Sequence, residues 1–206
     1  LKGQIIDKEA NNPCRFVDNG ELKYSLRSVE LYAPWVNKIY IVTDNQIPNW
    51  LNLDNPKIKI VDHKEIMPKS ALPSFNSAAI EHCIKNIPNL EEHFIYANDD
   101  MFFNLPTEPE FFFNKKGFPI VRFRKRSKKS HYTIYEYMLN NVDRLIYEKF
   151  KIKIDFEAHH NIDGHIKSEM INCYETYKEE INETINSHLR DKTNIERTIY
   201  LKYFIA

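Results

Sequence analysis

The stretch Lys38-Ile39-Tyr40-Ile41-Val42-Thr43-Asp44 is an apolar run that ends in a carboxylate. β-branched and aromatic residues dominate it, which is typical of a strand buried in an α/β sheet. Two later runs have the same form: residues 57–61 precede Asp62-His63, and residues 93–97 precede Asn98-Asp99-Asp100. Because ligands gather outside the carboxyl ends of such strands, we expect these acidic ends to meet at one rim.

Helical patterns flank these three runs. One helix is predicted from Asn19 to Pro34, with Asp18 or Asn19 as its N-cap. A second is predicted over residues 77–87, where apolar side chains recur at helical spacing. The order helix, strand, strand, helix, strand predicts an α/β fold.

The character of the chain changes after Pro106. Residues 111–113 and 118–123 are predicted to be short strands, and the chain from His131 onward is predicted to be mainly helical. Between these parts lies a basic run, formed by Arg122, Arg124, Lys125, Arg126, Lys128 and Lys129. It suits either a solvated loop or a patch for an anionic acceptor or a membrane surface.

Composition excludes several classes of protein. The 206 residues carry 29 Lys+Arg and 29 Asp+Glu, a balance that argues against a generally basic nucleic-acid binder. Four glycines leave no glycine-rich phosphate loop, and no run reaches the roughly 18 apolar residues of a membrane span. Cys14, Cys83 and Cys173 are widely spaced, which favours reduced core thiols over a disulfide framework or zinc site.

An acidic pair and a single glutamate are candidates for chemistry. Adjacent carboxylates such as Asp99 and Asp100 repel each other unless a cation neutralises them, and their hard oxygens suit Mg²⁺ or Mn²⁺ bound to substrate phosphates. The alternative is a solvated turn. Glu81 is either an exposed helix carboxylate or a further anionic ligand beside the acidic rim.

Histidine and arginine provide the remaining candidates. The pair His159-His160 suits a general base, a phosphate donor or a metal ligand, and equally a surface or capping position. The planar guanidinium of Arg190 suits a phosphate, and equally a surface ion pair.

Several motifs together resemble a known family. Residues 15–30 read RFVDNGELKYSLRSVE, residues 33–44 read APWVNKIYIVTD, residues 72–81 read LPSFNSAAIE, and residues 94–100 read FIYANDD. These closely resemble the second conserved region of the Stealth family, which includes bacterial capsular polysaccharide phosphotransferases and the animal lysosomal-enzyme GlcNAc-1-phosphotransferase. The resemblance covers roughly residues 15–106.

The C-terminal part resembles the family's third conserved region. Residues 158–163, AHHNID, are similar to its histidine motif, and residues 188–195, HLRDKTNI, to its arginine motif. Asn194 stands where the family usually has Asp, which weakens an acidic role there. The first conserved region is missing, which fits a cut N-terminus and implies that part of the nucleotide-sugar site is absent.

The resemblance implies an α/β fold with a Rossmann-like, glycosyltransferase-A-like sheet, helices on both faces, and a mainly helical C-terminal part. Residues 1–14 are then a tether cut from a longer chain, residues 15–125 the α/β catalytic core, and residues 126–206 the helical part of the same domain. Because both ends of the sequence read as cut from a longer protein, we expect this fragment to be inactive alone.

It also implies transfer of a sugar 1-phosphate from a UDP-sugar to a hydroxyl of an acceptor glycan, with release of UMP. Implied catalytic residues are Glu81, Asp100, His160 and Arg190. Implied substrate-binding residues are Asp18, Asn19, Arg27, Asn76 and Asn98. Mg²⁺ or Mn²⁺ is expected at Asp99 and Asp100, with Glu81 able to add a carboxylate, and His160 is the expected general base.

Two other functions stay open: a metal-dependent glycosyltransferase that transfers the sugar without phosphate, and a non-catalytic glycan-binding fragment. The few cysteines favour the bacterial cytoplasm, with peripheral association at the inner face of the membrane if the acceptor glycan is lipid-linked. No nucleic-acid partner is expected.

Overall fold

The computed structural model describes residues 12–13, 17–126, 131–159 and 161–206. Cys14, Lys128, Lys129 and His160, with most of the tether predicted over residues 1–14, lie outside them. In chain order the helices and strands are α1 (Glu21–Tyr32), β1 (Ile39–Thr43), β2 (Ile58–Asp62), α2 (His63–Ile66), α3 (Ser77–Cys83), β3 (His93–Tyr96), β4 (Phe123–Lys125), α4 (Ile134–Phe150), β5 (Phe156–Ala158), β6 (Asp163–Ile166), α5 (Lys167–Thr176), α6 (Lys178–Ile185) and α7 (Thr198–Ile205).

The two predicted strands β1 and β2 form a parallel pair, in register from Ile39 opposite Ile58 to Thr43 opposite Asp62. Both therefore end at the same edge, as expected. The Asp62 side chain accepts a hydrogen bond from the Lys64 backbone N–H at 2.8 Å and caps α2. Asp62 thus has a structural role, because a capping carboxylate satisfies a free helix N–H.

The third predicted strand, β3, does not extend this pair. It pairs antiparallel with β6, from His93 opposite Ile166 to Tyr96 opposite Asp163. Among the described residues, β1–β2, β3–β6 and β4–β5 form three separate two-stranded sheets. The α/β class is confirmed, but these pairs differ from the one sheet that the strand patterns predicted, and the glycosyltransferase-A-like arrangement stays a prediction.

The phenylalanine-rich segment also differs from its prediction. Residues 109–111 form a short 3-10 helix, and within residues 111–122, all of which the structure describes, a single isolated bridge joins Phe113 to Pro119. Phe112 is buried and packs against the rings of Trp35 and Phe103. Packing into this small cluster, rather than sheet pairing, accounts for the aromatic run.

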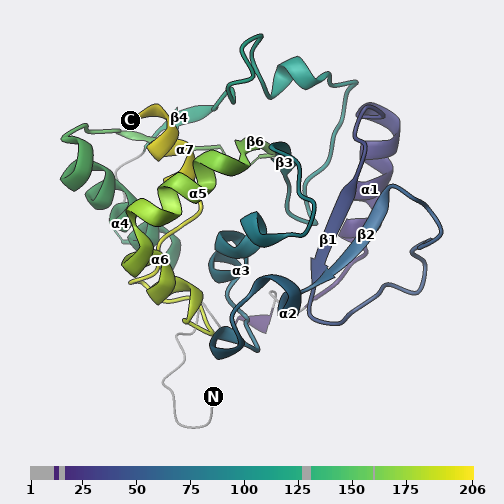
Figure 1. Cartoon of the computed structure of the whole chain (residues 1–206), viewed down its shortest axis with the longest axis horizontal. Coiled ribbons are helices and arrows are strands. Elements are labelled where there is room, and N and C mark those ends of the chain that lie inside the picture. Colours follow the sequence, from purple (N-terminus) through teal and green to yellow (C-terminus); the bar gives the residue numbers. More distant parts are fainter. Residues whose placement is uncertain (1–11, 14–16, 127–130, 160) are drawn as a thin grey trace.

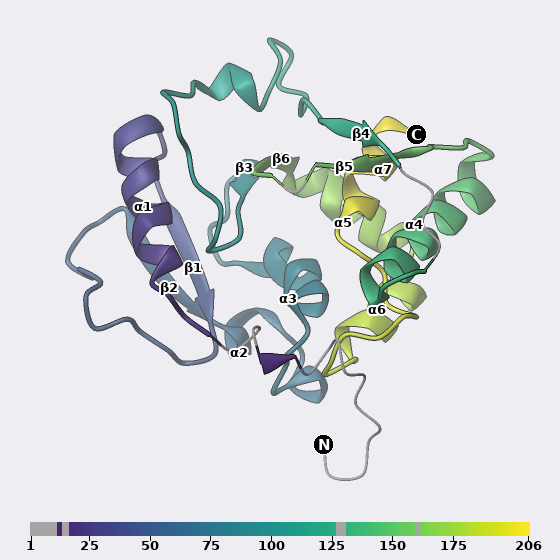
Figure 2. The same ribbon diagram turned by 180° about the vertical axis from the view of Figure 1, so that it is seen from behind.

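The C-terminal part contains the predicted helices and two short strands that the sequence pattern missed. Its buried side chains join those of the first half in one core cluster, in which Val61 and Ile84 belong to the same group as Val142, Ile181 and Ile199. α3 lies between the β1–β2 pair and the C-terminal helices in both views (Figures 1 and 2). The central position of α3 brings its side chains against both halves of the chain.

Two further expectations concern cysteines and membrane spans. Cys83 and Cys173 are buried free thiols, as predicted. Within the described residues, no helix has the length and apolar character needed to span a membrane.

Candidate active site

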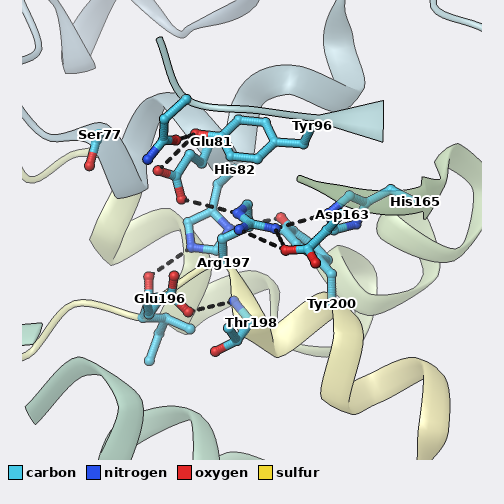
Figure 3. A network of polar contacts seen from close by, with 12 residues as sticks. Ser77, Glu81, His82, Tyr96, Asp163, His165, Glu196, Arg197, Thr198 and Tyr200 are labelled. Carbon is cyan, nitrogen blue, oxygen red and sulfur yellow. Dashed lines mark hydrogen bonds and ion pairs between the residues drawn. The ribbon is translucent and has the colours of Figure 1, made fainter. Parts of the chain in front are cut away.

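Glu81 lies in the middle of α3, a helix whose Ala78, Ala79 and Cys83 are packed into the interior. The residue is only 9% exposed, so it is not the solvated helix carboxylate of the first alternative. Its Oε2 lies 3.7 Å from Arg197 Nε, and its Oε1 lies 3.2 Å from the Tyr96 hydroxyl, which also lies 2.6 Å from Asn98 Oδ1 (Figure 3). One hydroxyl proton serves two acceptors, so Tyr96 links Glu81 to Asn98.

Arg197 is the centre of this network. The residue is 6% exposed, and its Nη1 and Nη2 each donate to Asp163 Oδ2 at 3.2 Å. Nη1 also lies 3.0 Å from His165 Nε2, and the guanidinium carbon lies 4.4 Å from the centre of the Tyr96 ring. Burial and the charge of Arg197 hold the pKa of His165 well below its usual value, so the neutral ring can accept this hydrogen bond.

His82 fastens α3 to the segment that carries Arg197. Its Nε2 donates to the Ile195 carbonyl at 2.9 Å, and its Nδ1 accepts from the Tyr200 hydroxyl at 2.8 Å. Burial lowers the pKa of His82 to about 4, which keeps the ring neutral. Ile195, two residues before Arg197, and Tyr200, three residues after it, are thereby held against the helix that carries Glu81.

The buried network changes the acidity of Glu81. Burial is the largest effect and, together with the negative charge of Glu196, raises the pKa of Glu81 to about 7. The charges of Arg197 and Arg190 and the Tyr96 hydrogen bond act in the opposite direction. Near neutral pH, Glu81 can therefore hold or release a proton, which an ordinary glutamate does not do there.

The turn Asn98-Asp99-Asp100 is a second, exposed acidic region. The Met101 backbone carbonyl, next along the chain, accepts from Ser25 Oγ at 2.7 Å, so α1 anchors the turn. Burial, opposed by a backbone hydrogen bond, raises the pKa of Asp99, and the negative charges of Asp100 and Glu21 add to the effect. The turn thus lies near the start of α1.

The described residues contain no group of three or more His, Cys, Asp or Glu side chains arranged to hold a metal ion. Glu81 is accordingly not gathered with Asp99 and Asp100 as a cation site. Two exposed carboxylates remain, and Mg²⁺ is commonly bound by one or two carboxylates together with substrate phosphates and water. Asp99 and Asp100 fit a cation of that kind, completed by the substrate.

Three of the predicted substrate-binding residues belong to α1 or to the segment before it. Asp18, Asn19 and Arg27 are exposed. Asp18 Oδ1 accepts from the Gly20 backbone N–H at 2.7 Å, and Asn19 Nδ2 donates to Glu21 Oε1 at 2.9 Å. The N-cap is Gly20, at φ 82°, rather than Asp18 or Asn19, because this left-handed conformation suits glycine.

Arg190 lies close to the start of α3. Its Nη2 donates to Ser77 Oγ, and its charge acts on Glu81 one turn further along the helix. Asn76, expected to bind substrate, is 0% exposed and donates to a neighbouring loop. Complete burial prevents direct contact with a substrate in this structure.

The structure therefore brings Glu81, Arg190 and Asn98 into one neighbourhood and places Asp99 and Asp100 beside Asn98. His160 falls outside the described residues, although its neighbours are placed: His159 N donates to the Arg122 carbonyl at 3.1 Å, and Asp163 binds Arg197.

Sequence reasoning assigned no role to Arg197, Asp163, Tyr96 or His165. Asp163 and Tyr96 lie within the motifs that resemble the family, and this position is the signal that could have identified them. Arg197 offered no local signal, because a buried arginine is recognised by acidic partners that come from elsewhere in the chain. His165 likewise gains its role only through the pairing of β6 with β3.

The three arginines of the basic run are paired within the protein. Arg122 Nη2 donates to the Phe111 carbonyl at 2.6 Å, Arg124 pairs with Glu157 at 2.6 Å, and Arg126 pairs with Asp143 at 2.5 Å. These contacts favour a structural role for the three arginines over a free anion-binding patch.

The family described as Stealth protein CR2, conserved region 2, matches residues 15–121, about half of the chain. The chain belongs to the Stealth family. The expectation drawn from the motifs is confirmed.

Individual relatives extend the similarity beyond that region. The chain is 37% identical over 217 residues to the capsular polysaccharide phosphotransferase fcs1 of Haemophilus influenzae, which covers 98% of this chain and 60% of the relative. It is 36% identical over 198 residues to the capsular polysaccharide phosphotransferase LcbA of Neisseria meningitidis, covering 93% of this chain and 54% of the relative. Exopolysaccharide phosphotransferase cps2G of Lactiplantibacillus plantarum is 56% identical over 112 residues, 54% of this chain and 33% of the relative. The chain thus spans between a third and three fifths of these relatives.

Proposed function

We propose that the protein transfers a sugar 1-phosphate from a UDP-sugar to a hydroxyl of an acceptor glycan, releasing UMP, in the synthesis of a capsular or exopolysaccharide. The observation that carries this proposal is the similarity over 93% and 98% of the chain to two capsular polysaccharide phosphotransferases. The activity is proposed for the complete protein, since the chain spans only part of each relative.

The reaction joins the acceptor oxygen to the β-phosphorus of the donor. The bond from that phosphorus to the bridging oxygen breaks, and this oxygen leaves with its electron pair on UMP. The acceptor's proton passes to a base, for which His160 is the residue implied by its motif. Arg190 is suited to stabilise the negative charge on the phosphate oxygens in the transition state.

The acidic turn supplies the second requirement, neutralisation of the pyrophosphate. Asp99 and Asp100 would hold Mg²⁺ or Mn²⁺, whose charge offsets that of the donor phosphates. Asn98, held by Tyr96, and the exposed Asp18, Asn19 and Arg27 would contact the donor. Glu81 would act behind this surface, keeping Tyr96 and Asn98 in place and exchanging a proton near neutral pH.

The setting that fits these substrates is the bacterial cytoplasm. Nucleotide sugars are soluble donors, whereas a lipid-linked glycan acceptor would bring the enzyme to the inner face of the membrane. Peripheral association there belongs to the proposal.

A donor labelled at its β-phosphate tests the proposal directly. The complete protein is incubated with a panel of labelled UDP-sugars, an acceptor glycan and Mg²⁺, and the products are separated and weighed by mass spectrometry. We expect the label in the glycan and unlabelled UMP. Label retained in UDP would instead establish an ordinary glycosyltransferase, and glycan binding without turnover would establish a binding protein.

A further inference from the structure

Asn76 immediately precedes α3 and is completely enclosed. Its Nδ2 lies 2.8 Å from Asn194 Oδ1, 3.0 Å from the Ser187 carbonyl and 3.4 Å from the Leu189 carbonyl. All three partners belong to one loop, residues 187–194, which we call the arginine loop because Arg190 lies in it. The amide of Asn76 thus joins the start of α3 to this loop.

The orientation of both amides is fixed by backbone groups. Asn194 Oδ1 also accepts from the Asp191 backbone N–H at 2.9 Å, so its oxygen, not its nitrogen, faces Asn76. Two of the three groups around Asn76 Nδ2 are carbonyls, which only accept. Asn76 Oδ1 is buried and has no hydrogen-bond partner among the described residues, so Asn76 acts here as a donor.

Further contacts hold the arginine loop to the same part of the chain. Phe75 N donates to the His188 carbonyl at 2.8 Å, and His188 Nδ1 donates to the Pro73 carbonyl at 2.7 Å. Arg190 itself donates to Ser77, the residue directly after Asn76. The backbone of the loop and its arginine are therefore held by three residues that precede α3 and by Ser77, the first residue of the helix.

We infer that Asn76, together with Asn194, is a positioning residue that orients Arg190 for phosphate transfer, rather than a residue that binds substrate. This inference rests on the proposed function, because it takes the role of Arg190 from it. It also gives Asn194 a role: its Oδ1 is the acceptor for both the Asn76 side chain and the Asp191 backbone N–H, and an amide provides this oxygen without a charge.

A double-mutant cycle in the complete protein tests the inference. Asn76→Asp replaces the donor by an oxygen that faces three acceptors at nearly constant side-chain volume. We expect it to lower kcat for sugar-phosphate transfer about tenfold to a hundredfold, with little change in the KM of the acceptor. In the Arg190→Ala background, the same change should lower kcat by less than about twofold, because residues that act as a unit are not additive.

Asn86→Asp is the matched control. It makes the same change in an amide whose Nδ2 donates to the Ile66 carbonyl rather than to the arginine loop, so we expect kcat within about threefold of the natural protein. If Asn76→Asp does not fold, as judged by its melting curve, the cycle is run with Asn76→Ser, whose shorter side chain keeps at most one of the three hydrogen bonds, and a lowered kcat is again expected.

Equal losses from the Asn76 substitution with and without Arg190 would overturn the inference, as would natural kcat in the Asn76 variants. Natural activity of Arg190→Ala would also overturn it. The labelled-donor assay on the natural protein decides the proposed reaction separately, so a failure of this inference leaves that result standing.

Discussion

The buried network around Arg197 and the exposed turn Asn98-Asp99-Asp100 both collect carboxylates, but they treat them differently. In the network, Arg197 binds Asp163 and lies beside Glu81, and all three residues are buried. In the turn, Asp99 and Asp100 face solvent at the end of β3. Tyr96 and Asn98 connect the two regions through one short hydrogen bond.

This difference separates two uses of charge. A buried charge is expensive to desolvate, so its partners must come from the protein and must stay in place. Exposed carboxylates that approach each other remain ready for a cation brought with the substrate. We therefore expect substitutions in the network to lower the free energy of unfolding, and substitutions in the turn to lower turnover.

Removing the centre of the network should give the largest effect on stability. Arg197→Met leaves Asp163 and Glu81 buried without their guanidinium, and breaking a buried pair in this way costs about 3–5 kcal/mol. Urea denaturation of the complete protein measures the loss. The matched change in the turn, Asp99→Asn, should stay within about 0.5 kcal/mol of the natural protein. If Arg197→Met lowered the free energy of unfolding by less than about 1 kcal/mol, the expected difference in stability between the two regions would be wrong.

The turn should show the opposite behaviour. Asp100→Asn removes one of two proposed cation ligands, and loss of metal-assisted charge neutralisation is worth a few kcal/mol, or about a hundredfold in turnover. Its unfolding free energy should not change measurably. Asp44→Asn, at the exposed end of β1, is the control and should keep natural turnover. Near-natural turnover of Asp100→Asn at saturating Mg²⁺ would contradict the proposal that Asp100 is a cation ligand.

Much of the local structure could be predicted from the sequence. The apolar runs at residues 38–44, 57–61 and 93–97 coincide with β1, β2 and β3 to within two residues, because strand pattern is a local property. The pairing of β3 was not predictable. Its partner β6 reads Asp-Gly-His-Ile, too short and too polar to be recognised as a strand.

The residues of the candidate site also differ in whether the sequence alone reveals them. Glu81, Arg190 and the acidic turn lie in motifs, so their residue types and the family resemblance identify them. Arg197 and the burial of Asn76 depend on where α7 and the arginine loop pack, which spacing along the chain does not reveal. Asn76 in particular has the residue type of a ligand contact but the burial of a core residue.

The smallest expected effect concerns the pH dependence of the network. Because burial raises the pKa of Glu81 from 4.5 to about 7, the folded protein binds this proton more tightly than the unfolded chain does. The stabilisation from the protonated form is complete below pH 4.5 and is lost as the pH rises toward 7 and beyond. Glu81→Gln imitates the protonated form and cannot lose it.

The stability difference between Glu81→Gln and the natural protein should therefore move in favour of the variant by on the order of 2 kcal/mol between pH 5 and pH 8. Urea denaturation at several pH values measures this difference. For the exposed Glu91→Gln, the corresponding difference should stay within about 0.5 kcal/mol over the same range. A Glu81→Gln curve parallel to that of the natural protein would show that Glu81 is charged throughout, as a permanent ion-pair partner of Arg197. Glu81 would then carry a fixed negative charge, like the carboxylates of the exposed turn, and would have no proton to exchange near neutral pH.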